Sequence, residues 1–154
     1  MRIKKVYQGN LADNKIVNAA SNSQTNTYSC DYINTNIGTI YSENFDNSTV
    51  ADNTLTTVGT ITLSKGTYII TGFGSFSSNS TGYRQMGIAT SSSSSSIDRS
   101  ATSTTASVSG STTTMQVIAM INPNAQTTYY LNVRQNSGSS LSFTYGGFRA
   151  IKLK

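Results

Sequence analysis

The feature that most constrains the fold of this chain is an alternating pattern over residues 54–76, TLTTVGTITLSKGTYIITGFGSF. The pattern predicts two β-strands folded about the turn at residues 64–66, because the residues of a strand point alternately to its two faces. Apolar or β-branched side chains occupy both faces of the second strand, in two sets: Tyr68, Ile70 and Phe76 on one face, and Ile69, Thr71 and Phe73 on the other. We therefore expect both faces to be covered, one by a second sheet and the other by a neighbouring subunit.

Neutral polar residues take the place of charged ones in much of the chain. Only 11% of the 154 residues are charged, against about 25% in typical soluble domains. A chain of this length forms one ordinary domain, and its many β-branched and aromatic residues distinguish it from disordered chains. An all-β pattern combined with a surface of Ser, Thr, Asn and Gly is typical of an extracellular or virion protein.

The distribution of charge disfavours nucleic acid as a partner. The net charge is +5, but the basic residues gather near the two ends of the chain, whereas nucleic-acid binders show a basic stripe with interleaved aromatic residues. No apolar run approaches the ~20 residues that span a bilayer, and the first residues lack the apolar core of a secretory signal. We therefore expect no nucleic acid and no membrane. A surface typical of extracellular proteins, combined with the lack of an export signal, fits a virion protein. Virion proteins leave the cell by particle assembly and host lysis.

Residues 1–36 differ from the rest of the chain and are predicted to form an N-terminal arm that precedes a head domain at 37–154. Residues 25–34, TNTYSCDYIN, place Tyr28, Tyr32 and Ile33 at helical spacing in this arm. Two interpretations stay open: a frayed arm, or an anchor that gains order on a partner. Cys30 is the only cysteine, so it is either a small buried hydrophobe or part of a bridge between chains.

The head domain is predicted to be all-β. Alternating segments are separated by short turns and show no helical period: 37–45, the two strands within 54–76, 84–90, 102–109, 112–122, 126–136, 141–145 and 148–153. Residues 46–53 are predicted to be a polar loop. About eight such strands predict an antiparallel sandwich or jelly roll.

Residue types that carry catalysis or bind metal are scarce. The chain contains no histidine, which removes the usual general base, the Ser-His-Asp triad and most zinc sites. Asp46 and Asp52 share one loop, but two carboxylates make a poor calcium site. We disfavour Asp46 with Asp98 as the carboxylate pair of a glycoside hydrolase. We expect no enzymatic activity, no catalytic residue, no metal and no cofactor.

Three stretches of the head domain follow one another in a recognisable order: ITLSKGTYIITGFGSF at 61–76, TTYYLNV at 127–133 and FTYGGFRAI at 143–151. Together they resemble the trimeric jelly-roll head shared by complement globular heads and tumour-necrosis-factor-like cytokines. Tyr130 takes the place of a customary aromatic residue, whereas Arg149 stands where the family usually has an apolar one. The acidic residues that hold calcium in some relatives have no counterpart here. This Ser/Thr/Asn-rich version is most similar to head domains on phage and prophage fibres.

The resemblance implies a jelly-roll domain that forms a homotrimeric fibre or spike head on the exterior of a phage particle. The arm would bind other virion proteins, and the head would bind the host cell surface, with a surface glycan as one candidate ligand. The alternative is a capsid decoration or head-fibre protein with a purely structural role and no receptor. The shortness of the arm favours this alternative, because tail fibres usually carry a long shaft.

Two sets of residues follow from this hypothesis. Candidates for the seam between subunits are Tyr68, Ile70, Tyr130, Tyr145 and Phe148, each of which could instead belong to the core of one chain. Candidates for ligand contacts flank the two most irregular loops: Tyr83, Arg84, Asp98 and Arg99. Exposed loops rich in Tyr, Ser, Gly and Asn suit adaptable polar recognition, although each candidate could instead be a solvated surface residue, which is the commoner case.

Overall fold

The computed structural model describes residues 38–97 and 101–153. Within these ranges every regular secondary-structure element is a β-strand. Eight strands follow one another along this part of the chain: β1 (Ile40–Val50), β2 (Thr56–Leu63), β3 (Tyr68–Phe76), β4 (Tyr83–Ala89), β5 (Thr102–Ala106), β6 (Thr113–Ile121), β7 (Thr127–Gln135) and β8 (Leu141–Lys152). The predicted all-β class and the approximate number of strands are confirmed. The predicted arm and the candidate contacts Asp98 and Arg99 lie outside the described residues.

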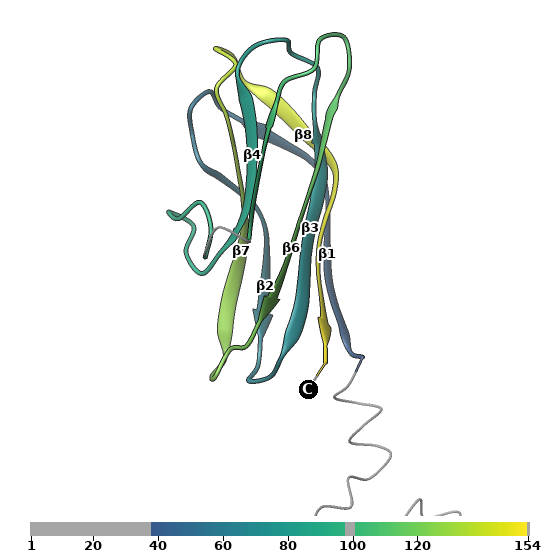
Figure 1. Ribbon diagram of the computed structural model, residues 1–154, viewed down its shortest axis with the longest axis vertical. Helices are drawn as coiled ribbons and strands as arrows, with labels where there is room; N and C mark the ends of the chain where they lie inside the picture. Colours follow the sequence, from purple (N-terminus) through teal and green to yellow (C-terminus); the bar gives the residue numbers. More distant parts are fainter. Residues whose placement is uncertain (1–37, 98–100, 154) are drawn as a thin grey trace, which may run out of the picture.

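The eight strands form two four-stranded sheets that pack face to face (Figure 1). The β1 sheet has the order β1-β8-β3-β6, and the β2 sheet has the order β2-β7-β4-β5. Neighbouring strands are antiparallel throughout both sheets. Among the described strands, β4 and β5 alone are both consecutive in sequence and paired, while the other connections cross between the sheets. An eight-stranded antiparallel sandwich wound in this way is a jelly roll.

The turn at residues 64–66 joins strands of different sheets. The two predicted strands and the turn between them are confirmed, but the strands do not pair with each other. β2 pairs with β7 in one sheet, while β3 lies between β8 and β6 in the other. The amide of Gly66 donates a hydrogen bond to the carbonyl of Pro123 at 3.1 Å, so two corners between the sheets meet here. Alternation assigns side chains to faces in either arrangement, and therefore does not separate a hairpin from a corner.

The core fills the space between the two sheets and is built by strict alternation. Every second residue of β3 and β6 is buried, and the β7 residues Tyr129, Leu131 and Val133 face them from the other sheet. Two glycines of β3 make room for large side chains. A Cβ atom on Gly72 would lie 2.3 Å from Leu131, and one on Gly74 would lie 2.4 Å from the ring of Phe143.

β1 continues to Val50, so the predicted polar loop at 46–53 is wrong over its first five residues. Four of them, residues 47–50, pair with β8, as in Asn47 opposite Thr144 and Val50 opposite Leu141. The sequence pattern hid this part of the strand because β1 is an edge strand. Polar side chains are tolerated there on the solvent side, so no apolar alternation marks the strand.

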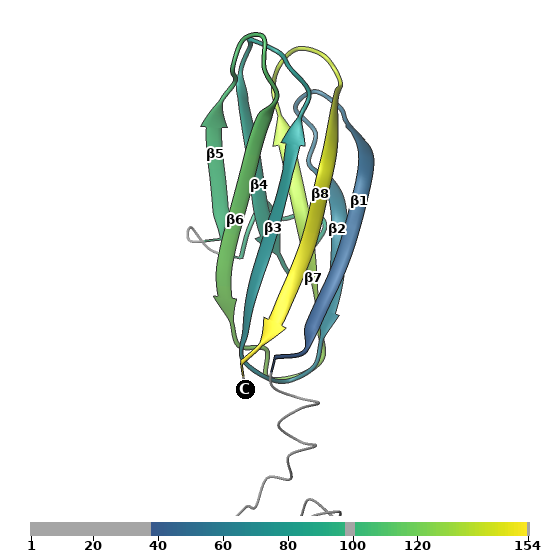
Figure 2. The same ribbon diagram turned by 90° about the vertical axis from the view of Figure 1, so that its right-hand side faces the viewer.

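The sandwich has two distinct ends. At the proximal end, the amide of Gly38 donates to the carbonyl of Lys152 at 2.8 Å, so the first described residue lies beside the end of β8. Figure 2 shows the end of the chain at this pole, together with the turns that follow β2 and β6. The distal end carries the connections at 51–55, 77–82, 107–112 and 136–140.

Candidate functional site

Four connections between strands gather at the distal end, and we call them together the distal loop surface: residues 51–55, 77–82, 107–112 and 136–140. Ser, Thr, Asn and Gly dominate three of them, and the connection at 51–55 contributes Asp52, Asn53 and Thr54. Most of these residues are exposed, in contrast to the alternating burial of the strands. The surface therefore presents hydroxyl and amide groups, which both donate and accept hydrogen bonds.

Hydrogen bonds tie the loop at 51–55 to the end of β7 and to the loop at 136–140. The amide of Asn53 donates to the carbonyl of Gln135 at 2.7 Å, and Arg134 Nη2 donates to Asn53 Oδ1 at 2.6 Å. The amide of Gly138 donates to Asp52 Oδ1 at 2.8 Å. Asn53 adopts a left-handed backbone conformation, which asparagine tolerates better than most residues.

The loop at 77–82 is held against the neighbouring loops in a similar way. The amide of Tyr83 donates to Asn136 Oδ1 at 2.6 Å, and the amide of Ser107 donates to the carbonyl of Gly82 at 3.2 Å. Gly82 has a φ of 74°, and a Cβ atom there would lie 2.2 Å from the carbonyl oxygen of Asn136. Glycine is required at this close contact.

A buried amide, Gln135, supports the distal loop surface from below. Its Nε2 donates to the carbonyls of Val50 at 3.1 Å and Ser139 at 2.7 Å, and its Oε1 accepts from the amide of Ser137 at 2.7 Å. Sequence reasoning missed this residue. The signal for it in the sequence was its position: Gln135 lies on the same inward face of β7 as Leu131 and Val133.

The structure contradicts the assignment of Arg84 as a surface contact. Arg84 has no exposed surface, because it shares the inward face of β4 with Met86 and Ile88. Its Nη1 donates to the carbonyls of Thr81 and Tyr83 at 3.0 Å each. Its Nη2 donates to the carbonyl of Asn79 at 3.1 Å. Burial lowers the pKa of its guanidinium through desolvation.

Arg84 therefore shapes the loop at 77–82 from inside. Its guanidinium also lies 5.8 Å from the ring centroid of Phe76, and its Nε has no hydrogen-bond partner among the described residues. Tyr83, the neighbouring candidate, is half-buried at the margin of the distal loop surface. Of the two ligand candidates that lie within the described residues, Tyr83 is thus at the surface and Arg84 is not.

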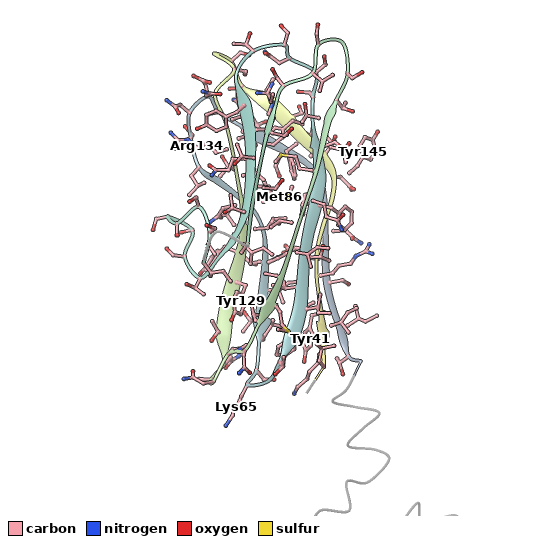
Figure 3. The ribbon with its side chains drawn as sticks, viewed as in Figure 1. Tyr41, Lys65, Met86, Tyr129, Arg134 and Tyr145 are labelled. Atoms are coloured by element: carbon pink, nitrogen blue, oxygen red, sulfur yellow. The ribbon has the colours of Figure 1, made fainter. Side chains whose placement is uncertain are left out.

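The five predicted seam residues are not brought together. Tyr68, Ile70 and Phe148 have no exposed surface in the single chain, so their assignment to a seam between subunits is wrong. They lie in the core because each faces the opposite sheet. Tyr130 is half-buried on β7 of the β2 sheet, whereas Tyr145 is 84% exposed on β8 of the β1 sheet, on the right-hand side of Figure 3.

A different set of apolar residues is exposed on the outer face of the β1 sheet. One residue from each of its four strands contributes to a row across the sheet, which we call the proximal aliphatic row: Ile40, Ile151, Ile69 and Met120. These side chains are 41% to 75% exposed. The row lies near the proximal end, since Ile40 and Ile151 adjoin the contact between Gly38 and Lys152. Single exposed aliphatic residues are ordinary on a protein surface, whereas large contiguous apolar patches are typical of interaction sites.

The described residues offer little chemistry beyond hydrogen bonding. No group of three or more metal-binding side chains occurs within 38–97 and 101–153. In the same part of the chain, no helix is long and apolar enough to cross a membrane.

Comparison with known proteins does not assign a family. The chain matches no protein-family model and no curated protein. The resemblance to trimeric jelly-roll heads therefore rests only on the three stretches that carry it.

Proposed function

We propose that this chain is the head of a homotrimeric fibre or spike on the exterior of a bacteriophage particle and that it attaches to the host cell surface. The observation that carries the proposal is the division of the molecule into two ends. The proximal end receives the chain at Gly38, and the distal end presents four polar loops. A head mounted by its proximal end would direct the distal loop surface outward.

The construction of the distal loops supports a role in recognition. Residues such as Gln135 and Arg84 hold the loops from inside, while most of the loop residues stay exposed and present hydroxyl and amide groups to a ligand. Loops held on a rigid scaffold are where proteins usually place binding residues. A pre-ordered loop loses less conformational entropy when it binds than a mobile one does.

The proximal aliphatic row supports the homotrimer. Each copy would bury this row against its neighbours, and closed symmetry would use the same row on every copy. The row occupies the half of the β1 sheet nearest Gly38, so assembly there would leave the distal loops accessible.

Binding of fluorescently labelled protein to host cells tests attachment, and electron microscopy of purified particles tests location. We expect labelled protein to coat host cells and to compete with whole particles. Charges introduced at two exposed distal positions, Ser80→Glu with Ser140→Glu, should weaken coating at least tenfold. The matched proximal pair, Asn124→Glu with Gln126→Glu, should leave coating unchanged.

Three outcomes would contradict the proposal in different ways. Coating that survives the distal charges would remove the distal loops from recognition. Protein located on the capsid shell that coats no cells would instead indicate a decoration protein. Absence of the protein from purified particles would refute the virion assignment altogether.

A further inference from the structure

Tyr145 combines exposure with an unfavourable backbone. Its side chain is 84% exposed, so packing does not hold it in place. Its φ is 52°, in the left-handed region that bulky residues with a Cβ atom rarely adopt. Glycine would fit this backbone with less strain. The tyrosine side chain therefore needs an explanation other than the stability of the fold.

An irregularity in the β8 strand aims this side chain outward. Along the pairing with β3, Gly147 stands opposite Phe73 and Thr144 stands opposite Ser75. Two residues of β8, Tyr145 and its neighbour, thus face a single residue of β3, which is the arrangement of a β-bulge. Bulges redirect side chains and occur frequently beside functional sites. In Figure 3, Tyr145 points away from the sandwich on the side of the β1 sheet.

A second aromatic residue lies next to the bulge on the same outer face. Phe73 is half-buried and packs over Gly147, where a Cβ atom would lie 2.7 Å from the Phe73 ring. The guanidinium carbon of Arg149 lies 5.1 Å from the centroid of that ring, which is a cation–π contact at the surface. The exposed side chains of Asn44 and Gln116 belong to the same cross-strand row.

We propose that Tyr145, Phe73 and Arg149 form a saccharide-binding strip on the outer face of the β1 sheet. An aromatic ring offers a flat apolar surface for the C–H face of a sugar, and the tyrosine hydroxyl can hydrogen-bond as well. Guanidinium and amide groups supply planar sets of donors and acceptors for sugar hydroxyls. This inference rests on the proposed attachment function, and it adds to the distal loop surface a second binding surface with a stated ligand class.

The strip remains open if copies of the chain pack through the proximal aliphatic row. Tyr145 and Ile151 are six positions apart along β8, which corresponds to roughly 20 Å in an extended strand. The guanidinium of Arg149 lies over Phe73, two positions closer to Tyr145 along the pairing with β8. The strip and the row are therefore separate surfaces of one sheet.

The test uses the full chain and an array of immobilised bacterial surface polysaccharides, with chemical denaturation measured in parallel. Tyr145→Gly should weaken binding at least tenfold while leaving the denaturation midpoint unchanged or higher, because the backbone strain is relieved. Tyr145→Trp should retain binding, and Arg149→Ala should weaken it. Tyr130→Ser removes a half-buried tyrosine from the other sheet and should leave binding unchanged.

The outcomes separate the strip from the attachment function. Wild-type binding that Tyr145→Gly does not reduce would overturn the strip while leaving attachment through the distal loops intact. A lower denaturation midpoint for Tyr145→Gly with unchanged binding would show that Tyr145 is structural. Wild-type protein that binds no polysaccharide but coats host cells would overturn the saccharide class. Failure of both assays would overturn the attachment function as well.

Discussion

At the residue scale, Arg84 places a positive charge inside the sandwich among backbone carbonyl groups. Arginine stays protonated in proteins even where desolvation lowers its pKa. Its two Nη groups hold the carbonyls of Asn79, Thr81 and Tyr83, so one side chain fixes both the loop at 77–82 and the start of β4. A neutral side chain of similar length could fill the space but could not bind these three acceptors.

Arg84→Met should lower the free energy of unfolding by about 2–3 kcal/mol, because it leaves buried acceptors without donors. Arg84→Lys should lose less, since an ammonium group still carries three donors. Urea denaturation of the two variants and the wild type would measure the difference. Equal stability of Arg84→Met and wild type would show that solvent replaces the guanidinium in these hydrogen bonds.

The sequence contained the signal for the position of Arg84, but the usual preference of charge for the surface obscured it. In the stretch RQMGIA, Arg84 has the same parity as Met86 and Ile88, which are buried. The same parity would have placed Tyr68 and Ile70 in the core with Phe76. The exposure of Tyr145 could not be predicted from parity, because a bulge interrupts the alternation of inward and outward side chains.

At the element scale, Gly74 on β3 makes room for the ring of Phe143, which belongs to the neighbouring strand β8 of the same sheet. Gly74 lies on β3 opposite that ring, and the Phe143 ring in turn lies 4.9 Å from the Phe76 ring, centroid to centroid. A methyl group at Gly74 has no space unless the ring moves. The small residue and the large ring therefore depend on each other.

Gly74→Ala should destabilise the fold by about 1–3 kcal/mol through overpacking. Phe143→Leu creates space at the same point, so the double variant should be more stable than the sum of the two single effects predicts. A double-mutant cycle in urea would measure this coupling. Gln116→Ala, on the exposed face of β6, is the control and should change stability little. Additive effects would mean that the ring already moves freely.

The existence of the strands was predictable, but their assignment to sheets was not. The strict alternation of β3 and β6, with apolar residues at most inward positions, makes these strands recognisable in the sequence. Which strand pairs with which depends on contacts between residues far apart in sequence, such as Ile70 opposite both Ala119 and Ala150. Alternation carries no information on such partners, so it cannot tell a corner between two sheets from a hairpin within one sheet.

At the scale of the whole molecule, the proximal aliphatic row predicts the state of association. Sedimentation of the wild-type chain should give three chains per particle. Ile69→Lys with Met120→Lys should give a folded monomer, because charges would oppose burial of the row. Gln116→Lys places one charge on the same face outside the row and should leave the trimer intact. A wild-type monomer would refute the assembly, and a trimeric double variant would place the seam elsewhere.

The position of Gly38 also determines how the domain would bear load. β1 begins two residues later and stays paired with β8 from Ile40 opposite Ile151 to Val50 opposite Leu141. Hydrogen bonds of an antiparallel pair run across the strands. A pull entering at Gly38 and resisted at the distal end therefore acts along β1 and loads this ladder in shear, many bonds at once, instead of peeling it open one bond at a time. The sandwich would therefore resist force best along its long axis, from the proximal to the distal end. This is the direction of the force on a head that joins a particle to a cell.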